Sequence, residues 1–518
     1  MNNSSYDEIQ YESKPHYPMH ADCLGTLGHL FGMRTAPAGK CRVLELGCAT
    51  AMNIICMADG LPESEFVGID LSPSQIEAGQ QLVDAAGLKN VRLHTASIMD
   101  LDESWGEFDY ILAHGVFSWV PDFVQEGVFA LCRRLLKPHG IAYISYNTYP
   151  GWHQRAVARE LMQYHCTGID DPQLKTQQAR AILSFMVKSA PFPNSPHARV
   201  LAEEADTLER APDSYVFHEH LEDSNTPLYF HQFMQRAGEH ELQYLGEAWQ
   251  HMQLDDLPAE VSESLQGISH DLIQLEQYAD FLTNRIFRRT LLCRDDVELD
   301  RSPSADVIGS LLASALGQPA SPEPDVRTAK EEKFKLHDGV VVHLTFPIVK
   351  AALVHLFKCW PQMVPFDELF AVSLAAIEDP AADREQQRAL LAAMLLRGHL
   401  THFVALHRQP FAFSLEVSER PKTSQLVRVL AAQWAMVPSR RHKLVPVPLA
   451  ERLLLTLLDG TRDLPTLARD FAAARADNVS ASGDADSRVA DLLVDSDELP
   501  AWIETTLKQF AWQALLIA

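Results

Sequence analysis

The sequence contains few cysteines and lacks the arrangements of them that mark metal or redox sites. Its eight cysteines are scattered, none forms a C-x-x-C pair, and no Cys/His group has the spacing of metal ligands. We therefore expect no metal centre, and free thiols in a reducing, cytoplasmic environment. Long apolar runs are also absent, since none approaches the about 18 residues that cross a bilayer, and the N-terminal MNNSSYDEIQ is polar. These features predict neither membrane anchoring nor export.

Basic residues are scarce relative to acidic ones. The chain has 44 lysines and arginines against 69 acidic residues, a formal net charge of −25. Such a surface repels phosphate backbones and attracts basic partners, so the composition argues against nucleic-acid binding. The one basic run, SRRHK at 439–443, is interpreted as a solvated loop.

Short apolar runs alternate with helical patterns in the first third of the chain. Strands are expected at 42–47, 66–70, 91–97, 108–115 and 141–147, and helices at 72–87 and 122–136. Ser72 is the expected N-cap of the first of these helices, with Pro73 in its first turn. This alternation predicts right-handed crossovers and a doubly wound, parallel α/β sheet of the Rossmann-like class.

The pattern changes after Trp152, and 518 residues are too many for one core. The expected units are a cofactor-binding core at 1–152, a helical cap at 153–210, a region at 211–320 that completes the sheet, and winged-helix-like modules at 334–420 and 421–518. A charged linker at 321–333 separates the two halves.

Three finer expectations accompany this division. YVFHEHLE at 215–222 is expected to be a strand, HLTHFVALHRQPFAFSLE at 399–416 a hairpin, and the Ala/Asp/Ser-rich stretch around 477–487 a loop.

The turn after the first expected strand carries the strongest chemical signal. VLELGCATAMN at 43–53 places Gly47 at the carboxyl edge of the sheet, where a helix begins and its N–H groups face a ligand. Asp70 ends the next strand, and a carboxylate there can bind both hydroxyls of a ribose. A dinucleotide would satisfy Asp70 equally well. Glu45 separates the two cofactors, because a carboxylate before the turn suits the ammonium group of S-adenosylmethionine and would repel a pyrophosphate.

The ends of the later strands supply further candidates, because ligands in open α/β sheets bind outside the carboxyl ends. Ser97 and Ile98 are placed beside an adenine ring, although a strand end packed in the core explains Ile98 equally well. His114 and Gly115 flank the expected methionine moiety. SYNTYPGWH at 145–153 directs Tyr146 and Asn147 to the site, where they and His114 are the catalytic candidates, unless Tyr146 only packs under the cap.

These stretches together resemble class I methyltransferases with a methyltransferase regulatory domain, which include rickettsial-type protein lysine methyltransferases acting on outer-membrane proteins. The resemblance rests on ELGCAxxxN at 45–53, IDLS at 69–72, ASIMDL at 96–101, FDYILAHGVFSWVP at 108–121, SYNTYPGW at 145–152 and HEHLEDSNTPLYFHQF at 218–233. It implies S-adenosyl-L-methionine as cofactor. It also adds the candidate cofactor contacts Tyr11, His20, Cys48, Ala49, Asn53 and Leu71.

One departure concerns the first turn. The family usually has small residues where this chain has Ala51 and Met52, and the bulk of Met52 predicts a weakened affinity for the cofactor.

The resemblance implies methyl transfer to a protein side chain, a lysine amine in a basic segment. Two alternatives stay open: a small-molecule methyltransferase with the cap as a lid, and a cofactor-sensing regulator with winged-helix modules. The oligomeric state, with a homodimer as one expectation, and the number of methyl groups are also left open.

Overall fold

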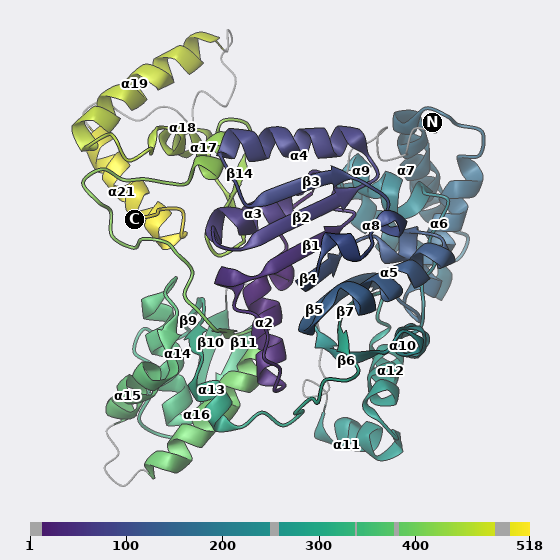
Figure 1. Cartoon of the computed structure of the whole chain (residues 1–518), viewed down its shortest axis with the longest axis horizontal. Coiled ribbons are helices and arrows are strands. Elements are labelled where there is room, and N and C mark those ends of the chain that lie inside the picture. The colour runs from purple at the N-terminus through teal and green to yellow at the C-terminus, as the bar shows by residue number, and fades with distance from the viewer. Residues whose placement is uncertain (1–12, 249–257, 337–338, 378–382, 482–497) are drawn as a thin grey trace.

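The computed structural model describes residues 13–248, 258–336, 339–377, 383–481 and 498–518. A seven-stranded sheet lies at its centre, in the order β3-β2-β1-β4-β5-β7-β6 (Figure 1). Its strands are β1 (Arg42–Leu46), β2 (Glu65–Asp70), β3 (Val91–Thr95), β4 (Phe108–Ala113), β5 (Leu136–Asn147), β6 (Leu242–Glu247) and β7 (Phe287–Arg294). The first five strands are parallel, and β7 runs antiparallel to both β5 and β6. The expected Rossmann-like α/β class is confirmed.

The helices that cross between the strands begin where the sequence indicates. They are α3 (Met52–Gly60), α4 (Pro73–Ala86) and α5 (Asp122–Leu135). Ser72 caps α4 by accepting a hydrogen bond from the backbone of Gln75, with Pro73 at the first helical position. Because the strands are buried on both faces, successive side chains enter different cores: Tyr143 packs with α3, and Ile144 packs with α5.

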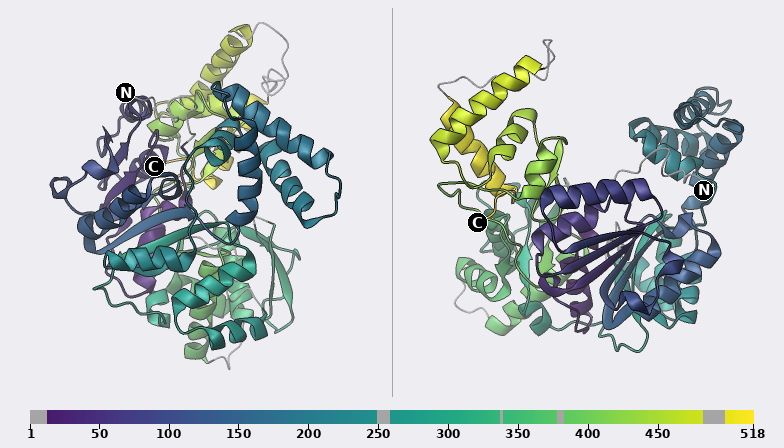
Figure 2. Two further views of the ribbon diagram at one scale, coloured as in Figure 1. Left: turned by 90° about the vertical axis from the view of Figure 1, so that its right-hand side faces the viewer. Right: turned by 45° about the horizontal axis from the view of Figure 1, so that its top comes forward.

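The cap is a three-helix unit beyond the carboxyl end of β5. It consists of α6 (Trp152–His165), α7 (Pro172–Lys188) and α8 (Pro196–Arg210), which share a small apolar cluster of their own. Figure 2 shows the cap and the C-terminal helices on opposite sides of the sheet. Residues 215–222 are not the expected strand. They form the end of α9 (Asp213–Val216) and a π-helical turn, η6 (Phe217–Leu221), because Phe217 and Leu221 pack into the cap cluster on the same side.

Residues 211–320 do not all join the sheet. The helices α10 (Phe230–Glu239), α11 (Ala259–Ile268) and α12 (Leu272–Thr283) accompany β6 and β7. The following segments α13 (Ala305–Gly309), β8 (Leu312–Ser314) and β9 (Gly317–Pro319) instead pack or pair with later residues. The expected boundary at 320 therefore falls inside the second unit, whose first strands are too short to give a clear sequence signal.

This second unit has two small sheets and three longer helices. Its other elements are β10 (Glu332–Leu336), β11 (Val341–Leu344), α14 (Pro347–Cys359), β12 (Val364–Pro365), α15 (Phe366–Ile377), α16 (Arg384–Leu400) and β13 (Ala405–His407). The hairpin expected over 399–416 is absent from these described residues. Its first strand, β13, pairs with β8, nearly 100 residues earlier, and the rest of the stretch forms no strand.

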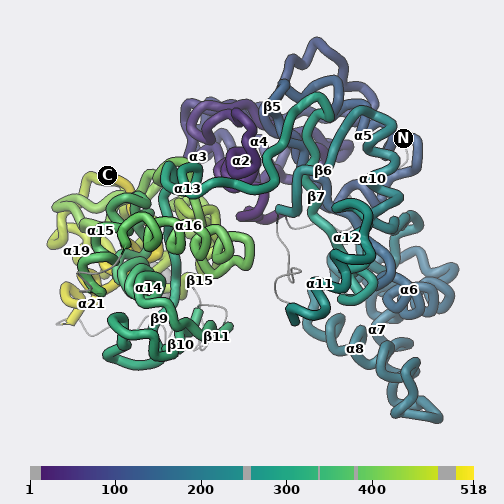
Figure 3. Tube along the Cα trace, turned by 90° about the horizontal axis from the view of Figure 1, so that it is seen from below, coloured from purple at the N-terminus to yellow at the C-terminus, as the bar shows by residue number. Residues whose placement is uncertain are grey.

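The C-terminal unit packs directly on the sheet domain. Its elements are α17 (Gln425–Ala431), β14 (Met436–Pro438), β15 (Leu444–Pro446), α18 (Leu449–Leu457), α19 (Leu464–Ala481) and α21 (Leu499–Trp512). Leu426 and Leu430 share one apolar core with Ile54 of α3 and Val83 of α4. Seen from below, the second and C-terminal units form a lobe beside the sheet and cap (Figure 3).

Two stretches, 439–443 and 477–487, are expected from the sequence to be loops. SRRHK at 439–443 is not a solvated loop: Arg441 and His442 are 3% and 2% exposed, because the β14–β15 connection enters the interface between units. In the stretch 477–487, α19 continues to Ala481, and 482–487 lie outside the described residues. None of the helices in the described ranges is long and apolar enough to cross a membrane.

Candidate functional site

A cavity of about 350 Å³ opens at the carboxyl edge of the parallel strands. Predicted site residues that line it are Glu45, Gly47, Cys48, Ala49, Asn53, Asp70, Leu71, Ser97, Ile98, His114 and Gly115. They follow β1 to β4, so the parallel order of the strands brings them to one edge of the sheet.

The turn after β1 runs close to its neighbours. Gly47 has φ +63°, and a Cβ atom there would lie 2.5 Å from Cγ2 of Val116. Ala49 and Ala51 also adopt left-handed φ values, of +50° and +58°. Because these two alanines tolerate the left-handed conformation, it is the close approach of Val116 that requires glycine at position 47.

Asp70 ties this turn to the end of β2. Its Oδ2 accepts the backbone N–H of Ala49 at 2.8 Å, and its Oδ1 accepts that of Ser72 at 2.9 Å. Each carboxylate oxygen has a second lone pair, so the group can also accept hydroxyl donors from a ligand in the cavity.

Glu45 is a buried carboxyl in the wall of the cavity. Its Oε1 accepts a 3.0 Å hydrogen bond from Nδ2 of Asn53, whereas Oε2 has no hydrogen-bond partner among the described residues. Burial raises the pKa of Glu45 to about 8, and the nearby Asp70 adds to the shift. An unpartnered buried oxygen beside a cavity fits a ligand that brings an ammonium group, which is what the amino-acid part of S-adenosylmethionine carries.

Two imidazoles meet on another wall. The ring centroids of His16 and His114 lie 4.3 Å apart, and Nδ1 of His114 contacts the Tyr143 hydroxyl at 3.0 Å. Burial lowers the pKa of His16 to about 4 and that of His114 well below its usual range. Both rings are therefore neutral at physiological pH.

The chain was compared with known families and structures. Family models match at 43–140 (methyltransferase domain), at 212–294 (predicted methyltransferase regulatory domain) and at 419–515 (PKMT, C-terminal winged helix domain). The structure of PKMT2 from Rickettsia typhi in complex with AdoHcy has a TM-score of 0.85 and 29% identity, covering 98% of this chain and 100% of that one.

Two uncharacterised proteins of Rickettsia prowazekii are also similar. RP789 is 36% identical over 470 residues, which cover 88% of this chain and 84% of that protein. RP028 is 42% identical over 236 residues, covering 46% of this chain and 94% of that protein. The chain belongs to the PKMT family. It is an S-adenosylmethionine-dependent methyltransferase.

Two residues of β5 that were expected at the site of this PKMT-family enzyme lie elsewhere. Tyr146 is 1% exposed and stacks on Phe233 at 4.1 Å, in the core on the α5 side of the sheet. Asn147 donates from Nδ2 to Oδ1 of Asn225 at 2.9 Å and does not line the cavity. The polar, aromatic end of β5 thus contacts α10 and Asn225 rather than the cavity.

Of the two candidates upstream of β1, the structure describes only His20. His20 caps α2 (Ala21–Leu30) by accepting from the backbone of Asp22, and it lines a different, smaller cavity. Tyr11 lies outside the described residues. His16, four residues before His20, lines the larger cavity instead.

Met52 does not line the cavity. Met52 is the first residue of α3, is 2% exposed and packs in the apolar core, so its bulk points away from the cavity.

Several residues that line the cavity are not among the sequence candidates, and they include Lys14, His16, His218 and Glu219. His218 and Glu219 come from η6, which carries no helical signal in the sequence because a π-helical turn shifts the usual period.

Proposed function

We propose that this enzyme transfers the methyl group of S-adenosylmethionine to the ε-amine of a lysine in a protein. PKMT abbreviates protein lysine methyltransferase, and the likeness to PKMT2 extends over 98% of the chain, including the units beyond the sheet. Bound S-adenosylmethionine supplies an electrophilic methyl carbon on a sulfonium. The residues that we propose to hold it are Glu45, Gly47, Cys48, Ala49, Asn53, Asp70, Leu71, Ser97, Ile98, His114 and Gly115, which line the cavity.

The acceptor amine has to lose a proton before it can attack. A lysine with an ordinary pKa is almost fully protonated at pH 7, and supplying its neutral form costs roughly 4–5 kcal/mol. The site therefore needs a group that attracts the ammonium and then helps to remove its proton.

The position of Glu219 in the cavity wall is the observation that supports this proposal. It lines the cavity beside His218, from a turn that joins the cap to the sheet domain. Burial raises the pKa of Glu219, opposed by Arg155 and Arg159, so its carboxylate is a better base than an exposed one. We assign Glu219 the role of binding the lysine ammonium and accepting its proton, with Trp119 as an apolar wall.

The turn that carries Glu219 is held by charged contacts within the cap. His220 lies 3.1 Å from Glu204, and Arg155 forms a 2.9 Å ion pair with the same carboxylate. Arg159 also donates to the backbone carbonyls of Glu219 and Glu222. This framework fixes the backbone of the turn, so Glu219 is presented by a rigid support.

We also propose a lysine-bearing, basic partner, because the net charge of −25 steers basic segments toward the enzyme. All eight cysteines are unpaired, which supports a reducing, cytoplasmic location. A homodimer remains a prediction.

The test uses S-adenosylmethionine labelled in its methyl group, with the wild type and Glu219→Gln. Added to a bacterial lysate, the wild type should label lysine side chains in protein, and Glu219→Gln should do so at least tenfold more slowly with unchanged affinity for AdoHcy. Glu203→Gln, an exposed residue of α8, removes the same charge and should keep wild-type activity.

Other outcomes would overturn the proposal. Label in small solutes alone would favour a small-molecule methyltransferase. Cofactor binding with no label transfer at any pH would favour the sensing regulator. Equal activity of Glu219→Gln and the wild type on protein would remove Glu219 from the acceptor site.

A further inference from the structure

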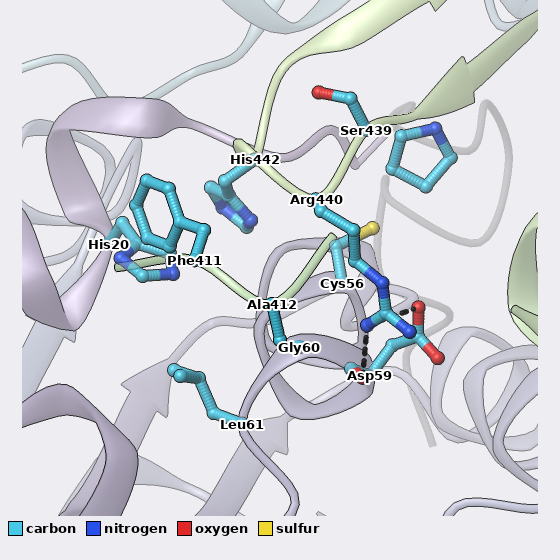
Figure 4. Close-up of a pocket in the computed structure, with 11 residues that line it drawn as sticks. His20, Cys56, Asp59, Gly60, Leu61, Phe411, Ala412, Ser439, Arg440 and His442 are labelled. Atoms are coloured by element: carbon cyan, nitrogen blue, oxygen red, sulfur yellow. Dashed lines mark hydrogen bonds and ion pairs between the residues drawn. The ribbon is translucent and has the colours of Figure 1, made fainter. Parts of the chain in front are cut away.

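The connection between β14 and β15 brings side chains of the C-terminal unit against α3. Arg440 forms an ion pair of 3.1 Å with Asp59, and the His442 ring lies 5.2 Å from that of His20 (Figure 4). The cavity drawn there has a volume of only about 10 Å³, room for no more than a water molecule, so it is not a ligand site. The relevant feature of this region is the hydrogen bond that His442 makes.

His442 is hydrogen-bonded to a residue of the cofactor cavity. Its Nε2 lies 2.9 Å from Oδ1 of Asn53, 389 residues earlier in the chain. Nδ2 of Asn53 in turn donates to Oε1 of Glu45 at 3.0 Å. Two hydrogen bonds thus connect the C-terminal unit to the carboxyl in the cavity wall.

The direction of these bonds follows from a third one. The backbone N–H of His16 reaches Oδ1 of Asn53 at 3.0 Å, and an N–H can only donate. Oδ1 of Asn53 is therefore the acceptor, Nδ2 faces Glu45, and His442 carries its proton on Nε2. Consistent with this tautomer, Nδ1 of His442 has no partner among the described residues.

We infer that His442 is a positioning residue for the cofactor. It holds the Asn53 amide, which binds one oxygen of Glu45 and leaves the other, Oε2, without a partner among the described residues. His442 lies inside the interface of the C-terminal unit, at 2% exposed, and does not line the cofactor cavity. The winged-helix unit thereby completes the cofactor site, whatever acceptor the enzyme uses.

A reciprocal effect follows from this arrangement. If seating His442 favours cofactor binding, cofactor binding must favour the seated position of the β14–β15 connection by the same free energy. The effect is partial, because the His16 N–H still holds Asn53 when His442 is absent.

The experiment is a calorimetric titration of the full-length enzyme with AdoHcy. His442→Ala should raise the Kd about fivefold. His442→Gln, whose amide nitrogen reaches close to the position of Nε2, should return it to within twofold of the wild type. Ala and Gln both occupy the left-handed backbone of this position, φ +55°, so backbone strain does not account for a difference between the two variants.

Arg440→Ala is the matched control, because it removes an interface contact of the same connection but leaves the chain from His442 to Glu45 intact. It should lower the melting temperature without changing the Kd for AdoHcy. Hydrogen exchange gives a second readout: AdoHcy should slow the exchange of amides at 439–443 in the wild type and in Arg440→Ala, and less so in His442→Ala.

Three results would overturn the inference. They are an unchanged Kd for His442→Ala, an equal loss for His442→Ala and Arg440→Ala, or no rescue by His442→Gln in a protein that melts like the wild type. The last two results would mean that the β14–β15 connection only docks the C-terminal unit on the sheet domain.

Discussion

The backbone N–H of Ala49 donates a 2.8 Å hydrogen bond to Oδ2 of Asp70, which joins the turn after β1 to the end of β2. One carboxylate therefore shapes the turn and faces the cavity. A change at this position should affect cofactor binding and local stability together.

Asp70→Ala should weaken AdoHcy binding by about 2–3 kcal/mol, because two charge-assisted acceptors are lost. Calorimetry measures the affinity, and thermal unfolding measures the loss of the bonds to Ala49 and Ser72. Asp70→Asn keeps the side-chain volume and one acceptor oxygen, so its affinity for AdoHcy should lie between those of the wild type and Asp70→Ala. An unchanged Kd for Asp70→Ala would disprove the assignment of the ribose hydroxyls to this carboxylate.

We expect Glu45 to release a proton when the cofactor binds. With its pKa raised to about 8 in the free enzyme, the carboxyl is protonated at pH 7, and a cofactor ammonium beside it favours the ionised form. AdoHcy binding at pH 7 should release close to one proton, and the release should vanish well above pH 8. Calorimetry in buffers of different ionisation enthalpy measures this number, and Glu45→Gln should abolish it.

The same shift sets a trend in stability. The folded pKa of Glu45 exceeds the value of about 4.3 expected in the unfolded chain. The stability it contributes is therefore full below about pH 4 and is lost as the pH rises to about 8. Denaturant unfolding of the cofactor-free enzyme should show this loss in the wild type and not in Glu45→Gln.

Tyr146→Phe should leave kcat within twofold of the wild type, because Tyr146 does not line the cavity. Its hydroxyl contacts Oγ1 of Thr290 at 3.2 Å, so the free energy of unfolding should fall by about 1 kcal/mol. Steady-state kinetics and urea unfolding test both statements. A tenfold fall in kcat at unchanged stability would return Tyr146 to the catalytic group.

Removal of residues 419–518 should abolish folding or cofactor binding. The sequence assigns residues 334–420 and 421–518 to modules separate from the cofactor-binding core. Instead, Leu426 and Leu430 share a core with Ile54 and Val83, so truncation exposes α3 and α4 to water. Soluble yield, melting temperature and AdoHcy titration measure the effect. A folded truncated enzyme with wild-type affinity would contradict it.

The features that the sequence predicted correctly are local. Apolar runs ending in glycine, the cap at Ser72 and the position of Asp70 at a strand end each depend on a few neighbouring residues. Parallel strands bring such ends to one edge, so the grouping of these residues around one cavity followed from the pattern.

Only the tertiary structure decided which side chains of a fully buried strand face the site. The end of β5 is buried on both faces, so its sequence does not tell that Tyr143 contacts His114 whereas Tyr146 packs against Phe233. Glu219 and His442 were hidden for a related reason. A π-helical turn carries one to the cavity, and the burial of a whole unit against α3 carries the other to Asn53. Both outcomes depend on which apolar surfaces meet, a property that no single stretch of sequence contains.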